Sequence, residues 1–114
     1  MTELEYLKLA RNAIEDKKGE KIKVLDITGL SPIADYFIIA TGSNSNQLHA
    51  ISDNVTEKLS AAGLHYKQIE GYRNANWILM DYGDFMIHLF TDEAREFYNL
   101  ERIWNDAKIA DIQE

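Results

Sequence analysis

The chain has 114 residues, which suits one domain, and its formal net charge is −7. It contains no cysteine, which excludes disulfides, cysteine-ligated zinc and thiol nucleophiles. The acidic balance disfavours binding to a bare phosphate backbone and favours a basic protein partner. The N-terminus lacks the basic stretch and apolar run of a signal peptide, and no apolar run approaches the ~20 residues that span a bilayer. We therefore expect a soluble cytoplasmic protein that does not enter a membrane.

The N-terminal third of the chain predicts one helix and two strands. Four apolar residues recur at helical spacing within residues 2–17, namely Leu4, Leu7, Ala10 and Ile14. Thr2 is of the residue type that caps the start of a helix. Residues 21–27 alternate and contain β-branched side chains, which indicates a strand. Residues 35–42 include an unbroken apolar run, which indicates a central strand covered by helices on both faces.

The middle of the chain predicts a second helix, over residues 43–63. An apolar stripe runs along the segment at helical spacing. Ser43, Asn44 or Ser45 can cap its start, and these alternatives remain open. Gly63 stands where a glycine commonly follows the last helical turn.

The C-terminal half predicts three strands and a last helix. Residues 64–70 indicate a weaker strand, and residues 77–90 a hairpin. A helix is predicted over residues 91–107, beginning at Thr91 or the next residue. Its expected buried face carries four side chains: Phe97, Leu100, Trp104 and Ala107. The element order predicts a single α/β (α+β) domain over residues 1–114, with a mixed β-sheet flanked by helices.

The hairpin sorts its side chains onto two faces. A two-residue loop at Gly83-Asp84, with glycine at the positive φ of a type II′ turn, or a loop shifted to Tyr82-Gly83, keeps the same faces. One face is entirely apolar or aromatic and is predicted to be core: Ile78, Met80, Tyr82, Phe85, Ile87 and Leu89. The other face mixes apolar and polar residues: Trp77, Leu79, Asp81, Met86, His88 and Phe90. Either the last helix or a protein partner covers this second face.

A metal site could use Asp81, Asp84 and His88, but the sequence gives this reading little support. Asp84 falls in the turn, and the other two side chains are not directly opposed. The alternative reading makes Asp84 a turn residue and His88 a half-exposed strand residue that hydrogen-bonds a neighbour.

The segment "ATGSNSN" at residues 40–46 suggests a different chemistry. A strand that leads through Gly-Ser into a helix resembles the phosphate-holding start of nucleotidyltransferases, because amides at a helix N-terminus can hold an anion. Such enzymes also need a pair of carboxylates for two magnesium ions, and no Asp-x-Asp follows. A small nucleotidyltransferase-like nucleotide-binding or metal-dependent enzyme is therefore kept as the alternative function.

Three segments together resemble one family. They are "ADYFIIATGSNSNQLHAISDNV", "EGYRNANWILMDYGDFMIHLF" and "REFYNLERIW". Their order and spacing resemble the signature of the ribosomal silencing factor family, also called RsfS or Iojap. The resemblance covers roughly residues 5–107.

This resemblance implies a nucleotidyltransferase-like fold without the catalytic carboxylates, and a protein that is not an enzyme and has no cofactor. It implies binding to the large ribosomal subunit through large-subunit ribosomal protein fourteen at the intersubunit face. The bound factor would block docking of the small subunit and repress translation, with little direct nucleic-acid contact. It also implies a homodimer when free. A further hypothesis is a dimer or scaffold whose apolar hairpin face meets only its own copy.

Six residues match the expected contact positions of the family: Glu70, Trp77, Leu79, Asp81, Tyr82 and His88. Arg95 and Tyr98 are expected as neighbours. The resemblance suggests Trp77 as the buried anchor, Leu79 as its apolar flank and Asp81 as the partner of a basic side chain. The alternative reading is internal: Trp77 packs under the last helix, and Arg95 pairs with Glu101 or Asp81.

Overall fold

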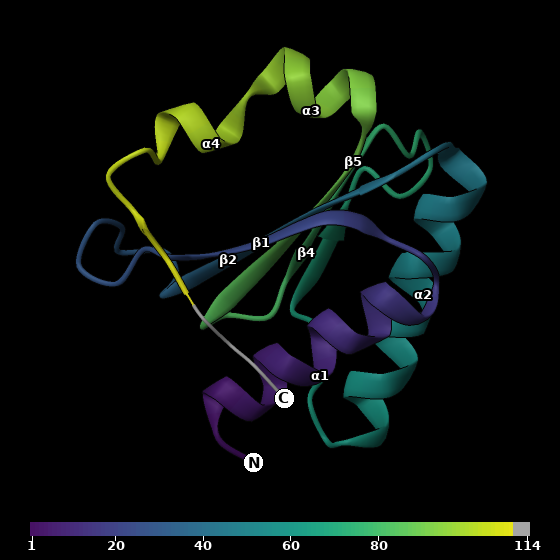
Figure 1. Cartoon of the computed structure of the whole chain (residues 1–114). Helices are drawn as coiled ribbons and strands as arrows, with labels where there is room; N and C mark the ends of the chain where they lie inside the picture. The colour runs from purple at the N-terminus through teal and green to yellow at the C-terminus, as the bar shows by residue number, and fades with distance from the viewer. Residues whose placement is uncertain (111–114) are drawn as a thin grey trace.

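The computed structural model describes residues 1–110, in which six strands form one sheet with helices on both faces (Figure 1). The strands are β1 (Glu20–Asp26), β2 (Tyr36–Gly42), β3 (Gln68–Glu70), β4 (Trp77–Asp81), β5 (Phe85–Thr91) and β6 (Lys108–Ile109). The helices are α1 (Glu3–Asp16), α2 (Ser45–Ala61), α3 (Asp92–Tyr98) and α4 (Leu100–Ile103). The strand order across the sheet is β3-β4-β5-β2-β1-β6.

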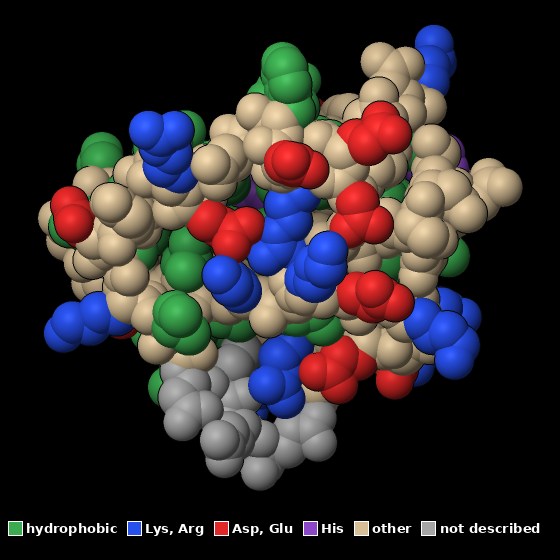
Figure 2. Space-filling model, turned by 45° about the horizontal axis from the view of Figure 1, so that its top comes forward, with side chains coloured by type: hydrophobic (Ala, Val, Ile, Leu, Met, Phe, Trp, Pro, Cys, Tyr) green, Lys and Arg blue, Asp and Glu red, His purple; other side chains and the backbone are tan. Residues whose placement is uncertain are grey.

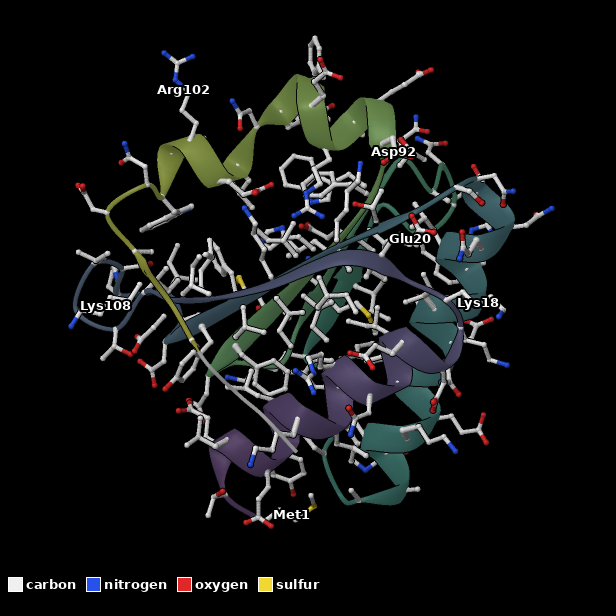
Figure 3. All side chains as sticks on the ribbon, in the orientation of Figure 1. Met1, Lys18, Glu20, Asp92, Arg102 and Lys108 are labelled. Carbon is white, nitrogen blue, oxygen red and sulfur yellow. The ribbon has the colours of Figure 1, made fainter. Side chains whose placement is uncertain are left out.

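The sheet is mixed, as predicted. β2 runs parallel to β5, and the other neighbouring strands pair antiparallel. A parallel pair needs a crossover connection, which here contains α2 and the strands β3 and β4. Helices α1 and α2 cover one face, α3 and α4 lie across the other, and side chains fill both spaces (Figures 1 and 3). The central strand β2 is buried from Phe37 to Gly42, which confirms that it is covered on both sides.

Helix α1 begins where the sequence predicts but buries a slightly different stripe. The Thr2 hydroxyl accepts a hydrogen bond from the Glu5 amide, and the Glu5 carboxylate accepts one from the Thr2 amide, which completes a capping box. The buried residues are Leu7, Ala10, Ala13 and Ile14. Leu4, which shares their helical spacing in the sequence, is 47% exposed and lies outside this stripe. Because Ala13 also belongs to the buried stripe, the centre of the buried helix face lies away from Leu4.

Helix α2 is capped at both ends by the predicted chemistry. Among the three candidates, Asn44 is the N-cap, and its side-chain oxygen accepts a hydrogen bond from the Gln47 amide at 2.9 Å. Gly63 follows the helix with a φ of +92°, which a glycine adopts without strain. Of the strand predicted over residues 64–70, only Gln68–Glu70 forms β3, and the Leu64 amide instead donates to the Leu59 carbonyl in the last helical turn.

The single helix predicted over residues 91–107 is wrong. Asn99 adopts a left-handed conformation, with a φ of +45°, and divides the segment into α3 and α4. Phe97 is therefore turned to solvent and is 81% exposed, whereas Leu100 and Trp104 pack onto the sheet. The chain then adds β6, an edge strand that the sequence did not predict.

We predict that the helix break depends on the tolerance of asparagine for the left-handed region. Replacing Asn99 by a β-branched residue should lower the free energy of unfolding by about 1–2 kcal/mol, because the branched side chain clashes with the backbone in the left-handed conformation. Asn99→Val and Asn99→Gly are compared by urea denaturation. Glycine should leave stability near that of the wild type, and equal losses for the two variants would contradict this account.

Candidate partner-binding face

The hairpin has the predicted register and turn. Ile78 lies opposite Leu89, and Met80 opposite Ile87. The loop is Gly83-Asp84, and Gly83 has the predicted positive φ, at +89°, while the Asp84 amide donates to the Tyr82 carbonyl at 3.2 Å. All six residues predicted to be core are buried: Ile78, Met80, Tyr82, Phe85, Ile87 and Leu89. The Asp81 carboxylate accepts a hydrogen bond from the Gly83 amide at 2.8 Å, so Asp81 also holds the turn.

The second hairpin face is divided between the two coverings that the sequence left open. Over β1, β2 and β5, side chains from the C-terminal segment bury an apolar cluster that includes Phe37, Ile39 and Phe90. Over β3 and β4, the side chains stay partly or fully exposed. Pairing places Glu70 beside Leu79 on this uncovered part. We call the surface made by Glu70, Trp77, Leu79 and Asp81 the open sheet face.

Trp77 lies at the border between the covered and open parts. Its ring is half-buried and contacts the rings of Tyr98 at 4.7 Å and Phe90 at 5.1 Å, measured between centroids. Its indole N–H donates a hydrogen bond to Nδ1 of His88 at 3.1 Å. The internal reading is thus confirmed in part, since α3 supplies Tyr98 against one side of the tryptophan. The same contacts hold the ring in one orientation.

His88 is a buried residue, so its predicted half exposure is wrong. It is 4% exposed, and the ring of Phe37 meets it edge to face at 4.7 Å. Burial lowers the pKa of His88 to about 4, which keeps the imidazole neutral near pH 7. A neutral ring that accepts at Nδ1 carries its proton on Nε2, which is buried without a hydrogen-bond partner among residues 1–110.

The six predicted contact residues do not share one surface. Tyr82 lies on the core face of the hairpin, is 5% exposed and stacks on Phe85 at 5.3 Å. Burial raises the pKa of Tyr82 to about 12. His88 lies beneath Trp77, so of the six residues only those of the open sheet face can be reached from solvent.

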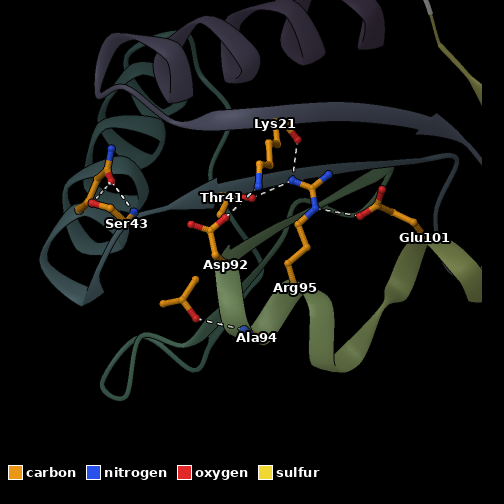
Figure 4. A network of polar contacts seen from close by, with 9 residues as sticks. Lys21, Thr41, Ser43, Asp92, Ala94, Arg95 and Glu101 are labelled. Carbon is orange, nitrogen blue, oxygen red and sulfur yellow. Dashed lines mark hydrogen bonds and ion pairs between the residues drawn. The ribbon is translucent and has the colours of Figure 1, made fainter.

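Arg95 holds α3 against the sheet through a network of polar contacts (Figure 4). Its Nε donates to the Glu101 carboxylate at 2.8 Å, and its Nη1 donates to the Thr41 hydroxyl at 2.8 Å and the Lys21 carbonyl at 2.6 Å. Lys23 adds a second ion pair to Glu101 at 2.9 Å. Hydrogen bonding by Arg95 holds the pKa of Glu101 below its usual value.

The surface view shows basic and acidic side chains interleaved on this side of the molecule (Figure 2). The network confirms the predicted internal pairing of Arg95 with Glu101. The sequence did not reveal Lys21 or Thr41 as partners, because they are far away along the chain. Arg95 thereby positions the helix that brings Tyr98 onto Trp77.

The structure does not bring together the three residues that were weighed as a metal site, Asp81, Asp84 and His88. His88 is buried, Asp81 is bonded to the turn, and Asp84 instead lies near the carboxylates of Glu3 and Asp35. In that cluster, partial burial, together with the neighbouring acids, raises the pKa of Glu3 to about 7.

The helix N-terminus that suggested a phosphate site is occupied by the protein itself. The side-chain oxygen of Gln47 accepts hydrogen bonds from the Ser43 amide at 2.6 Å and the Ser43 hydroxyl at 2.8 Å (Figure 4). The backbone amide of Gln47 donates to the side-chain oxygen of Asn44. The Gln47 side-chain nitrogen donates to the carbonyls of Lys17 and Lys18. An anion would have to displace this arrangement, which argues against the nucleotidyltransferase alternative.

The fold and the site together define a mixed α/β protein whose sheet is partly uncovered on one face, at Glu70, Trp77, Leu79 and Asp81. Within residues 1–110, no helix is long and apolar enough to cross a membrane. The model of the family described as ribosomal silencing factor during starvation, RsfS, matches residues 1–114. The chain belongs to this family, which confirms the resemblance found in the sequence.

Relatives and a solved structure agree with this assignment. The ribosomal silencing factor RsfS of Halalkalibacterium halodurans is 39% identical over 113 residues, covering 99% of this chain and 97% of the relative. That of Bacillus subtilis is 39% identical over 112 residues, covering 98% and 95%. A crystal structure of protein CV0518 from Chromobacterium violaceum matches with a TM-score of 0.90 and 32% identity, over 100% of this chain and 94% of that one. The same mixed sheet with flanking helices is therefore shared.

We predict that His88 makes the protein less stable in mild acid. Its pKa is lower in the folded state than in the unfolded state, so unfolding takes up a proton as the pH falls from about 6.5 to about 4. The wild type should lose a few kcal/mol of unfolding free energy over this window, and this contribution is fully present above it. In His88→Gln, whose amide can still accept from Trp77, urea denaturation should show a smaller loss. Equal losses in both proteins would contradict the assignment.

Proposed function

We propose that the protein binds the large ribosomal subunit through large-subunit ribosomal protein fourteen, at the intersubunit face. Bound there, it physically blocks the small subunit and represses translation without catalysing a reaction. The open sheet face is the observation that supports this proposal, because it joins apolar and acidic side chains on a surface that the protein's own helices leave partly exposed. Membership of a family described as silencing factors supports the regulatory role.

The charge of the chain favours a protein contact over an RNA contact. At a net charge of −7, the chain as a whole repels a phosphate backbone. On the open sheet face, Glu70 is exposed and Asp81 is partly exposed. These carboxylates suit lysine and arginine side chains of a ribosomal protein, which they would orient during encounter.

We assign different roles to the residues of the proposed site. Trp77 is the aromatic anchor, with Leu79 as its apolar flank. His88 acts from below by holding the indole N–H of Trp77, and it makes no direct contact in this proposal. Tyr82 supports the hairpin from the core side. We assign the direct contact to Glu70, Trp77, Leu79 and Asp81.

The proposal extends to the free protein. In the free protein, two copies can cover each other's partly apolar face and keep it from solvent until a partner binds. We therefore expect a homodimer when no ribosome is bound, and a cytoplasmic location where ribosomal subunits meet.

We predict that Glu70→Lys weakens binding to isolated large subunits by about tenfold, since one favourable charge becomes a repulsive one. Glu57→Lys makes the same charge change on an exposed site of α2 and should bind like the wild type. The measurement is co-sedimentation with separated subunits, followed by a subunit-joining assay. If both variants weaken binding equally, net charge rather than the open sheet face governs the interaction.

Trp77→Ala should cost about 2 kcal/mol or more of binding free energy, as expected for an aromatic anchor. Circular dichroism first establishes that the variant folds, because Trp77 also packs on Tyr98 and Phe90. A folded Trp77→Ala that co-sediments like the wild type would remove Trp77 from the site. A wild type that fails to bind large subunits would overturn the proposed function itself.

A further inference from the structure

The loop over residues 71–76, between β3 and β4, is fixed in place by its backbone. Gly71 has a φ of +78°, and a Cβ there would lie 2.1 Å from the Trp77 carbonyl oxygen, so only glycine fits. The Ala75 amide donates to the Gly71 carbonyl at 2.9 Å, and the Ser45 hydroxyl of α2 donates to the Ala75 carbonyl at 3.5 Å. Ala75 is fully buried. The loop is therefore a closed turn attached to α2.

This turn presents Tyr72 to α2, where two residues one helical turn apart hold it. The Tyr72 hydroxyl donates to the Asp53 carboxylate at 2.9 Å. The His49 ring packs on the Tyr72 ring at 4.4 Å, and a His49 ring nitrogen contacts the Tyr72 carbonyl. The aromatic ring is thus oriented before any ligand arrives, which reduces the entropy that binding would cost.

Tyr72 forms one wall of a pocket of about 320 Å³ between α2 and β3. The lining residues are Ser52, Asp53, Thr56, Tyr66, Ile69 and Tyr72. Both tyrosines are partly exposed, at 43% for Tyr66 and 40% for Tyr72. The rings of Tyr66 and Tyr82 meet edge to face with their centroids 6.5 Å apart, so this wall also contacts the core. Asp53 is an exposed carboxylate on the pocket lining.

We propose that this pocket binds an arginine side chain from a basic segment of a protein partner. A guanidinium group is planar and cationic, so it can stack on a tyrosine ring and donate hydrogen bonds to a carboxylate. Two tyrosines and Asp53 supply both kinds of contact. The volume lies near the lower end of ligand pockets and suits one long side chain.

The net charge of the chain favours an arginine side chain over a nucleotide in this pocket. A nucleobase could also stack on the two tyrosines. Its phosphate would then lie close to Asp53 in a chain of net charge −7, whereas an arginine brings the complementary charge. The tyrosine rings of the pocket and the negative charge of the chain therefore both favour a guanidinium group as the ligand.

The pocket is separate from the open sheet face. Its lining comes from α2, from Ile69 on the side of β3 that packs against the α1 and α2 core, and from the two tyrosines in the segments that flank β3. Glu70 and Leu79 point to the other side of the sheet, because successive strand residues alternate. The inference therefore does not rest on the proposed function, and a failure of one leaves the other standing.

The test uses the full chain labelled with ¹⁵N and the peptide acetyl-Gly-Arg-Gly-amide. We expect the peptide to shift the amide signals of Asp53, Tyr66 and Tyr72 with saturable binding. The same peptide with citrulline in place of arginine keeps the shape and loses the charge, and should bind at least about tenfold more weakly. Equal binding of the two peptides would overturn the proposal, as would uridine monophosphate shifting these signals while the arginine peptide does not.

A matched pair of variants separates the pocket from general charge effects. Asp53→Asn keeps an oxygen that can accept from the Tyr72 hydroxyl but removes the charge, and it should weaken the arginine peptide about tenfold. Glu57→Gln makes the same charge change on the same helix outside the pocket lining and should bind the peptide like the wild type. Equal affinities for Asp53→Asn and the wild type would remove Asp53, and with it the proposed site.

Discussion

The structure depends on a mismatch between the width of the sheet and the width of its C-terminal cover. Six strands spaced about 4.8 Å apart span about 24 Å, whereas α3 and α4 form one row of helix about 10–12 Å wide that runs back along the strands (Figure 1). β2 must be covered on both faces because four consecutive residues, Phe37 to Ala40, are apolar and point to both sides of the sheet. The long helices α1 and α2 cover one face, but α3 and α4 cover only the β1, β2 and β5 part of the other. The open sheet face follows from this shortage.

The hydrogen-bonded pair of Trp77 and His88 lies at the border between the covered part and the open part of this sheet face. The histidine is buried and neutral, which costs free energy unless its nitrogens are bonded, and the indole N–H meets one of them. The aromatic rings around Trp77 also form one continuous group that includes Tyr98 of α3. The position of a residue expected to touch a partner is therefore coupled to the position of α3, and through Arg95 to β1 and β2.

Local patterns predicted the features that local physics determines. The two-residue alternation and Gly83 specified the hairpin register, because a shift of one residue would move every apolar side chain to solvent. The caps of α1 and α2 were likewise visible as short polar signatures. The break at Asn99 was missed because only one residue leaves the helical region, and its neighbours favour a helix.

Other features depended on distant parts of the chain. The burial of His88 requires Phe37, and the Arg95 network requires Thr41, neither of which a pattern in the hairpin or the last helix can reveal. The site was thus predicted as a face, while the division of that face into a covered and an open part came from tertiary packing. Tyr82 shows the same limit: its place on the core face follows from alternation, whereas its place among the contact residues came only from the family signature.

The small size of the open sheet face constrains how the proposed partner can dock. A stable protein interface buries about 800 Å² on each side and involves about 20 residues or more, which four residues cannot supply. One adjoining surface is α3, because Tyr98 contacts Trp77 and the neighbouring Phe97 is 81% exposed. In the proposed interface, α3 is the neighbour that adds apolar area to the open sheet face. Since Arg95 orients that helix, its bonds to Thr41 and Glu101 would set how Phe97 is placed beside the open sheet face.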